Sequence, residues 1–227
     1  MGKNKLRRFN ELHTFSNVIE ADFNDVYNKN HPYKGNWNKI FDNDNPIILE
    51  LGCGKGEYSV DLAIAIPDKN FIGIDIKGNR MWVGARKALD LKLNNVFFIR
   101  TRIEFIESFF APNEVDEIWI TFPDPQPQSN RKRKRLTSDV FLNRYRNFLK
   151  PQGLIHLKTD SDLLYDYTLN LVRKNNLTVV YSIYDLYSSG KEFLAYNIQT
   201  FYEKMFLIEN KPIHYLQFKL DGNITTE

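Results

Sequence analysis

Residues 46–57 read PIILELGCGKGE, an apolar run followed by a turn that contains three glycines. The run is short and rich in Ile and Leu, which is typical of a buried strand. Glycines at positions 52, 54 and 56 let the backbone approach a ligand closely, because no Cβ intervenes. Residues 57–66, which come next, have helical spacing. The stretch therefore predicts a strand, a ligand-binding turn and a helix, in that order.

Further apolar runs follow at intervals, and segments with helical spacing separate them. The runs are residues 70–74, 96–100, 117–122 and 154–158, and the helical segments are 78–91, 103–110, 137–149 and 161–175. This alternation is the pattern of a parallel sheet with helices on both faces. Residues 177–183 and 213–220 are predicted as a final hairpin-like pair, with helix-like residues 200–209 between them. The predicted fold class is α/β, with a doubly wound, mostly parallel, seven-stranded sheet and helices on both faces.

Length and composition limit the class of protein. The chain has 227 residues, of which 42% are hydrophobic and 26% charged, so it is long enough for one sizeable globular core. A single cysteine, Cys53, and four scattered histidines give no zinc-ligand spacing, and no metal is predicted. No apolar run approaches the roughly 18 residues of a spanning helix, so a cytoplasmic protein with no membrane partner is predicted. Residues 1–40 lack clean periodicity and are predicted as an N-terminal arm before a domain at 41–227.

Two carboxylates accompany the glycine turn. Asp75 ends the second predicted strand, close to the offset of roughly 20 residues at which a carboxylate accepts ribose hydroxyls. The spacing G-x-G-x-G differs from the dinucleotide fingerprint, and Glu50 would repel a pyrophosphate. A carboxylate there suits S-adenosylmethionine, which carries an ammonium and a sulfonium. The predicted cofactor is S-adenosylmethionine, bound by Glu50, Gly52, Gly54 and Asp75; a simple strand-to-helix turn is the alternative.

A proline-rich turn and a basic run follow the fourth predicted strand. Residues 121–127 read TFPDPQP, and the prolines hold Asp124 in an extended or turn conformation at the edge where open α/β sheets bind ligands. A plain turn aspartate is the alternative. The basic run suits phosphates, and its place beside the cofactor crevice favours RNA over a solvated loop. Its five members are Arg131, Lys132, Arg133, Lys134 and Arg135, and Lys3, Lys5, Arg7 and Arg8 could extend that surface.

Two polar features near the carboxyl end have both a local and a functional interpretation. Asp160 ends the fifth strand at the ligand edge, and it could equally cap the helix that opens at Ser161. Thr200 and Glu203 have the S/T-x-x-E spacing of a capping box. Local sequence alone favours the capping role for the second pair.

Taken together, the motifs resemble a known family, the bacterial tRNA (guanine-N7)-methyltransferases, which have the Rossmann-like class I methyltransferase fold. The matching segments are YKGNWNKIF (33–41), LELGCGKGEY (49–58), FIGIDIKGNR (71–80), FPDP (122–125) with a basic run ending RKRL, IHLKTD (155–160) and TFYE (200–203). The resemblance implies an enzyme that transfers a methyl group from S-adenosylmethionine to N7 of guanosine at position 46 of the tRNA variable loop. It also implies tRNA as partner and a monomer or homodimer.

The resemblance also implies roles for single residues. Glu50 and Asp75 correspond to the cofactor carboxylates, and Asp124 corresponds to the aspartate assigned to cofactor binding and catalysis. The guanine-recognition elements correspond to Asp160, Thr200, Phe201, Tyr202 and Glu203.

The chain departs from the family pattern at three positions. Gln126 stands where the family commonly has tryptophan, and Gln128 stands at the first lysine, a substrate contact. Arg102 occupies the place of an adenine-proximal aspartate, so its backbone or neighbouring Glu104 is expected to serve the cofactor there.

The reaction itself needs little proton chemistry. Guanine N7 has a lone pair and no proton, so positioning does most of the work. A fixed carboxylate such as Asp124 or Asp160 could stabilise the positive charge that develops on the purine. The three departures favour one rival, a non-catalytic RNA-binding protein with a degenerate methyltransferase fold. A small-molecule methyltransferase is the second rival.

Overall fold

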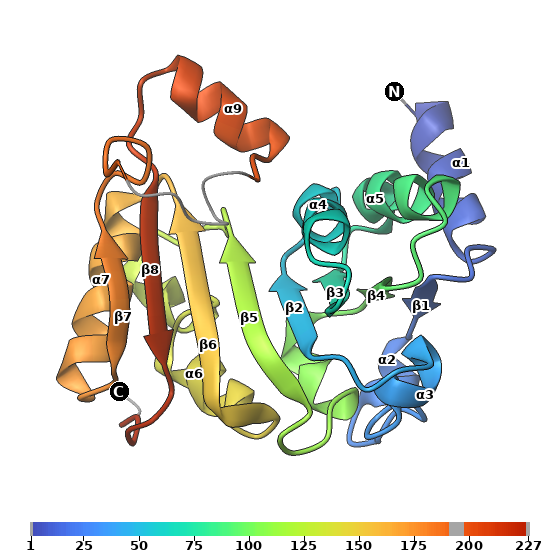
Figure 1. Cartoon of the computed structure of the whole chain (residues 1–227), viewed down its shortest axis with the longest axis horizontal. Helices are drawn as coiled ribbons and strands as arrows, with labels where there is room; N and C mark the ends of the chain where they lie inside the picture. The colour runs from blue at the N-terminus through green and yellow to red at the C-terminus, as the bar shows by residue number, and fades with distance from the viewer. Residues whose placement is uncertain (1, 191–197, 226–227) are drawn as a thin grey trace. The chain divides into compact units, whose positions relative to one another are not determined.

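The computed structural model describes residues 2–190 and 198–225, and the chain forms two compact units, Met1–Val115 and Asp116–Glu227. The first unit runs from blue to green in Figure 1, and the second from green to red. The predicted boundary between an arm at 1–40 and a domain at 41–227 is a different division and stays a prediction.

Four parallel strands form the sheet of the first unit. They are β1 (Val18–Glu20), β2 (Ile47–Leu51), β3 (Asn70–Asp75) and β4 (Val96–Arg100), in the order β1-β4-β3-β2. The register pairs Ile48 with Phe71 and Gly73 with Phe98. Every residue of β2 is buried, which explains its continuous apolar sequence. The sheet thus brings the ends of β2 and β3, where Glu50 and Asp75 lie, side by side.

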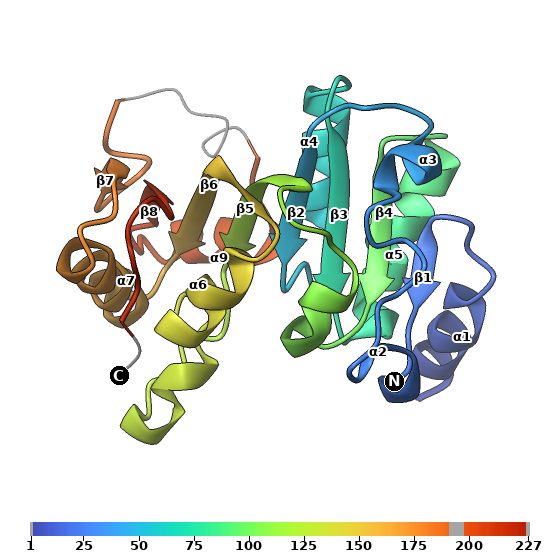
Figure 2. The same ribbon diagram turned by 90° about the horizontal axis from the view of Figure 1, so that it is seen from below.

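Helices cover both faces of this sheet. They are α1 (Gly2–Leu12), α2 (Phe23–Val26), α3 (Trp37–Phe41), α4 (Glu57–Ala65), α5 (Gly78–Asp90) and the 3-10 helix η1 (Ile103–Ser108). On one face α4 packs beside α5, and α5 packs beside α1, as Figures 1 and 2 show. Phe98 points to that face, whereas its neighbour Phe97 contacts Phe41 of α3, with ring centroids 5.2 Å apart. Alternate residues of one strand therefore serve the two helical layers.

Four strands form the sheet of the second unit. The strands are β5 (Val115–Thr121), β6 (Leu149–Thr159), β7 (Val179–Ile183) and β8 (His214–Lys219), in the order β5-β6-β8-β7. Strand β8 runs antiparallel to both β6 and β7, so the predicted hairpin-like ending is confirmed. The helices are η2 (Ser129–Lys134), α6 (Asp139–Tyr145), α7 (Asp162–Lys174) and α9 (Phe201–Ile208). Helix α7 packs against β6, β7 and β8.

The α/β class and the mostly parallel strands are confirmed, with three differences in detail. The described residues form eight strands where seven were expected, because β1 comes from the arm and its three half-buried residues are too few for a periodic signal. Residues 103–108 form a 3-10 helix. Helix α6 ends at Tyr145, because buried Leu149 already belongs to β6. No helix among the described residues is long and apolar enough to cross a membrane.

Candidate cofactor and substrate sites

The glycine turn after β2 has a backbone conformation that residues other than glycine rarely adopt. Gly52, Gly54 and Gly56 have φ values of 74°, 54° and 69°. A Cβ on Gly56 would lie 2.5 Å from the ring of Phe98, so this glycine is required for packing. A Cβ on Gly54 would meet no atom closer than 3.9 Å. The turn is therefore packed at one end and open at Gly54, where a ligand has room to approach.

Asp75 ties the end of β3 to this turn. Its Oδ2 accepts a hydrogen bond from the Gly54 amide at 2.9 Å, and its Oδ1 accepts one from the Lys77 amide at 2.8 Å. A carboxylate oxygen has two lone pairs, so both atoms can accept further hydrogen bonds from ribose hydroxyls. The structure thus brings together the two elements from which a nucleoside site was predicted.

Glu50 has a local partner that the sequence did not reveal. Its side chain is buried, and its Oε2 accepts bonds from the Ser59 amide at 2.9 Å and the Ser59 hydroxyl at 2.5 Å. Ser59 lies in the first turn of α4, so Glu50 satisfies an amide at the start of that helix. A serine in the first turn after the glycines was the only sequence signal for this contact. Binding of a cofactor ammonium by Glu50 stays a prediction.

The cysteine of the turn, Cys53, is a buried free thiol. Burial, together with the charges of Glu50 and Asp75, raises the pKa of the Cys53 thiol well above its usual range. The thiol therefore stays protonated at neutral pH, and only the thiolate reacts readily. Cys53 fills space between the turn and its neighbours.

Arg102 lines a cavity of about 240 Å³ in the first unit. The cavity lies where β3 and β4 end, and Ile76, which follows Asp75 directly, belongs to its lining with Phe105. The Arg102 side chain is exposed, and its residue precedes η1. Arg102 therefore lies near Ile76, the residue after the candidate ribose carboxylate Asp75. Position 102 itself has a basic side chain where the family has an acidic one. Glu104, the expected substitute, is exposed in η1 and is not among the residues that line this cavity.

In the second unit, the loop after β5 is held in a strained shape. Phe122 and Gln126 are not glycines but have φ values of 47° and 45°. The Phe122 amide donates to the Lys158 carbonyl at 2.8 Å, and the exposed Asp124 carboxylate accepts from the Gln126 amide at 3.0 Å. The local turn role of Asp124 is therefore present, and its side chain still faces solvent. Gln128 is exposed just before η2.

The five basic residues after this loop divide into two groups. Arg135 is only 6% exposed, and its guanidinium donates to the Pro125 carbonyl at 3.1 Å and to the Gln126 carbonyl at 3.1 and 3.3 Å. The same guanidinium lies 4.3 Å from the ring centroid of Tyr167. Arg135 therefore clamps the loop that carries Asp124. The other four lie in η2, where Lys132 is half-buried and Arg131, Arg133 and Lys134 are exposed.

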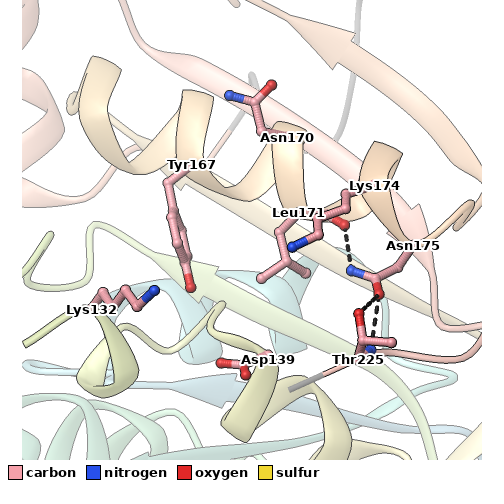
Figure 3. A pocket seen from close by; sticks show the side chains of 8 residues that line it. All are labelled: Lys132, Asp139, Tyr167, Asn170, Leu171, Lys174, Asn175 and Thr225. Carbon is pink, nitrogen blue, oxygen red and sulfur yellow. Dashed lines mark hydrogen bonds between the residues drawn. The ribbon is translucent and has the colours of Figure 1, made fainter. Parts of the chain in front are cut away.

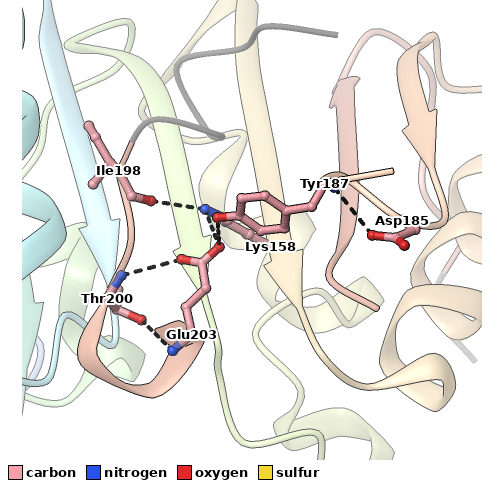
Figure 4. Close-up of polar contacts among 6 residues, drawn as sticks. All are labelled: Lys158, Asp185, Tyr187, Ile198, Thr200 and Glu203. Atoms are coloured by element: carbon pink, nitrogen blue, oxygen red, sulfur yellow. Dashed lines mark hydrogen bonds and ion pairs between the residues drawn. The ribbon is translucent and has the colours of Figure 1, made fainter. Parts of the chain in front are cut away.

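The start of α9 is fixed by a buried charge cluster (Figure 4). Thr200 and Glu203 form the expected capping box, with bonds of 3.2 and 3.3 Å. Oε1 of Glu203 also accepts from the Lys158 ammonium and from the Tyr187 hydroxyl, each at 2.6 Å. Both charged side chains are 0% exposed, and the ammonium donates a further bond to the Ile198 carbonyl at 3.0 Å. Burial lowers the pKa of Lys158, and Glu203 partly offsets that effect.

Asp160 does not cap α7. The helix cap is Ser161, whose hydroxyl accepts from the Leu164 amide at 3.3 Å. The local interpretation of Asp160 as the cap of this helix was therefore wrong. Its half-buried carboxylate lies directly after β6 and can serve another role. The side chains of Phe201 and Tyr202 lie outside the described residues.

The comparisons with known proteins agree on the kind of chemistry. A family model described as a putative methyltransferase matches residues 44–216. The chain is 53% identical over 222 residues to a tRNA (guanine-N(7)-)-methyltransferase of Christiangramia forsetii, covering 96% of this chain and 98% of the relative. A Bacteroides thetaiotaomicron protein of the same name is 48% identical and covers 97% and 87%.

Solved structures extend the likeness to the fold. The 16S rRNA methyltransferase KamB superposes with a TM-score of 0.62 at 11% identity, covering 82% of this chain and 92% of that one. An antibiotic-related methyltransferase gives a TM-score of 0.58 at 16% identity, covering 86% and 96%. At such identities the likeness supports a class I methyltransferase fold and nothing finer.

Proposed function

Because this chain belongs to the family of tRNA (guanine-N(7)-)-methyltransferases, we propose that it transfers a methyl group from S-adenosylmethionine to N7 of a guanosine in tRNA. The observation that carries the proposal is 53% identity over nearly the whole length of both chains. The guanosine is the one at position 46 of the variable loop. The protein works in the cytoplasm as a monomer or homodimer. A non-catalytic RNA-binding protein is disfavoured, because the cofactor turn keeps its glycines and its carboxylate.

The glycine turn fits the cofactor. S-adenosylmethionine supplies an electrophilic methyl group on a sulfonium and carries no phosphate. The open side of Gly54 admits a ligand against the backbone, and Asp75 retains lone pairs for ribose hydroxyls. Ile76 and Arg102 line the cavity beside Asp75, which makes it the proposed place for the adenine ring. Glu50 contributes negative charge near the cofactor ammonium, while it holds the start of α4.

Asp124 is the proposed catalytic residue. Its carboxylate is exposed, while its backbone is fixed by the strained loop and the Arg135 clamp. N7 needs no general base, so the contribution of Asp124 is to stabilise the positive charge that develops on the purine. Asp160, free of a capping role, is proposed to contact the guanine. Thr200, Phe201 and Tyr202 complete the guanine contacts, and Glu203 holds their segment in place through Lys158.

The function is tested by incubating the purified protein with methyl-labelled S-adenosylmethionine and unmodified bulk tRNA, followed by nucleoside analysis. Label in 7-methylguanosine is expected. Absence of label, despite measured cofactor binding and an active control enzyme, would overturn the proposal and favour the RNA-binding alternative.

The role of Asp124 is tested by single-turnover rates. We expect Asp124→Ala to slow methyl transfer about 100-fold or more, because it removes charge stabilisation in the transition state. Asp160→Ala tests the guanine contact in parallel, and Asp68→Ala, at an exposed site in the first unit, is the control. An unchanged rate for Asp124→Ala would show that this carboxylate is not catalytic.

A further inference from the structure

A cavity of the first unit and one of the second differ in their linings. The second unit has a cavity of about 220 Å³ between η2, α6 and α7, where polar groups of one wall are bonded to one another (Figure 3). There the Asn175 side chain donates to the Leu171 carbonyl at 2.8 Å and accepts from the Thr225 amide at 2.9 Å. The cavity of about 240 Å³ in the first unit instead has exposed apolar walls, since Phe23 is 54% exposed and Ile76 49%. Apolar surface around a cavity suits an organic ligand.

The N-terminal arm reaches this cavity because it adds a strand to the sheet. Strand β1 lies beside β4 and runs parallel to it, with Glu20 opposite Arg100 (Figure 2). Strand β4 pairs in turn with β3, with Arg100 opposite Asp75. These three residues end their strands, so they form one row at the edge where open α/β sheets bind ligands. Residues 21–23 of the arm therefore lie at the same edge as the candidate ribose carboxylate.

The cavity is built from the segments that follow these three strands. Phe23 of the arm and Phe105 of η1 meet edge to face, with ring centroids 5.5 Å apart. Ile76, directly after β3, contributes a further apolar surface. The polar lining residues come from the segments after β1 and β4, and they are Asp22, Arg100, Thr101 and Arg102.

These polar residues differ in what they offer to an adenine. The 6-amino group of adenine donates hydrogen bonds and a guanidinium only donates, so neither Arg100 nor Arg102 can accept from it. Thr101 is 4% exposed. Asp22 is the acidic residue among the described residues of the lining, and it is exposed. It lies two residues beyond Glu20, just as Arg102 lies two beyond Arg100, so both hold equivalent positions after neighbouring strands.

Asp22 also has a local role, which orients it. It is the N-cap of α2 and forms a capping box with Asp25, in which the Asp22 amide donates to the Asp25 carboxylate at 2.9 Å. The helix is anchored by Val26, which is 1% exposed and whose carbonyl accepts from the Ser108 hydroxyl at 2.9 Å. A carboxylate has about four lone-pair sites, so a bond within the capping box leaves it able to accept another. Asp22 is therefore a positioned acceptor at the cavity.

We propose that Asp22 accepts a hydrogen bond from the 6-amino group of the adenine of S-adenosylmethionine. The proposal rests on the proposed function, which places the adenine in this cavity. The ribose hydroxyls then bind Asp75 at the end of β3, and the far edge of the adenine binds a carboxylate of the arm. A purine without the amino group leaves Asp22 without this bond, so the arm selects adenine.

The test is isothermal titration of the full chain with two ligands. One is S-adenosylhomocysteine, the product that methyl transfer leaves, and the other is its analogue with hydrogen in place of the 6-amino group. We expect the wild type to prefer the first about tenfold, because a hydrogen bond to a charged group is worth that much. Asp22→Ser keeps a good helix cap without the carboxylate. It should bind S-adenosylhomocysteine about tenfold more weakly and prefer it less than about twofold.

Asp25→Ser is the matched control, because it removes the other carboxylate of the same capping box at an exposed residue outside the cavity lining. It should keep the tenfold preference for the amino group. If Asp22→Ser keeps that preference too, Asp22 does not contact the adenine and the proposal is wrong. If both variants lose it equally, the order of α2 sets the preference, which also overturns a direct contact.

Failure of this contact and failure of the function give different results. The analogue should bind all three proteins equally, which shows that each variant is folded with an intact site. A wild type that makes 7-methylguanosine while Asp22→Ser keeps the preference leaves the function standing without the contact. A wild type that binds neither ligand and does not methylate tRNA overturns both.

Discussion

The two units hold their functional residues by different means. In the first, carboxylates accept hydrogen bonds from backbone amides, as Asp75 does from Gly54 and Glu50 from Ser59. In the second, long cationic side chains make the contacts, as Arg135 does with the loop of Asp124 and Lys158 with Glu203. The first arrangement can be predicted from the spacing of the glycines in the sequence. The second depends on charges that look like surface residues until the chain has folded.

The largest expected effect comes from the buried pair of the second unit. Lys158→Ala leaves the Glu203 carboxylate buried without its cation, and we expect a loss of about 3–5 kcal/mol in the free energy of unfolding. Urea denaturation measures it. The double variant Lys158→Met with Glu203→Met should recover much of the loss, because no charge is then buried unpaired. If the single variant loses under about 1 kcal/mol, the pair does not organise α9.

A smaller effect is expected in the first unit, where two glycines of one turn can be compared. Gly56→Ala places a Cβ against the ring of Phe98 and puts a residue with a side chain at a positive φ. We expect it to lower the free energy of unfolding by about 2–4 kcal/mol. A Cβ on Gly54 would have room, so Gly54→Ala should lower the free energy of unfolding only by the backbone strain, about 1–2 kcal/mol.

Cofactor binding then separates the two glycines. Isothermal titration with S-adenosylmethionine should show a large loss of affinity for Gly54→Ala, beyond what its stability predicts. Equal affinity losses in both variants would mean that the open side of Gly54 is not where the cofactor approaches.

The smallest expected change is Arg135→Lys, which keeps the charge but loses the fork that reaches two carbonyls and the stacking on Tyr167. We expect a stability loss of about 1–2 kcal/mol and a fall in kcat with little change in KM for tRNA, because the loop of Asp124 loosens. Arg133→Lys, at an exposed position, is the control. A rise in KM alone, with a lower salt slope, would instead make Arg135 a phosphate ligand.

These contrasts explain which parts of the fold and the site could be predicted from the sequence. Apolar runs predicted seven strands, most of which are largely buried although β7 is mostly exposed, whereas β1 is short and half-buried and gave no periodic signal. The glycine turn and Asp75 were predicted because their spacing is a backbone requirement. The capping box of Thr200 was predicted for the same local reason.

What the sequence could not supply are contacts made by tertiary packing. Nothing near Arg135 distinguishes it from the four basic residues before it, yet only Arg135 of that run is buried. Lys158 lies in a strand where a lysine suggests an exposed position, and its partner Glu203 comes from a helix far along the chain. Asp160 and Ser161 are adjacent and both suit a helix cap, so only the geometry decides between them.

Each unit is a single uninterrupted stretch of chain, Met1–Val115 followed by Asp116–Glu227. During synthesis, the residues that form the cofactor turn and its carboxylates have therefore all left the ribosome before those of the loop of Asp124. Translation at roughly 5–20 residues per second adds Asp124 only about 0.5–2 seconds after Val115. The chain therefore carries every residue of the glycine turn and its carboxylates shortly before the elements proposed to recognise tRNA are made.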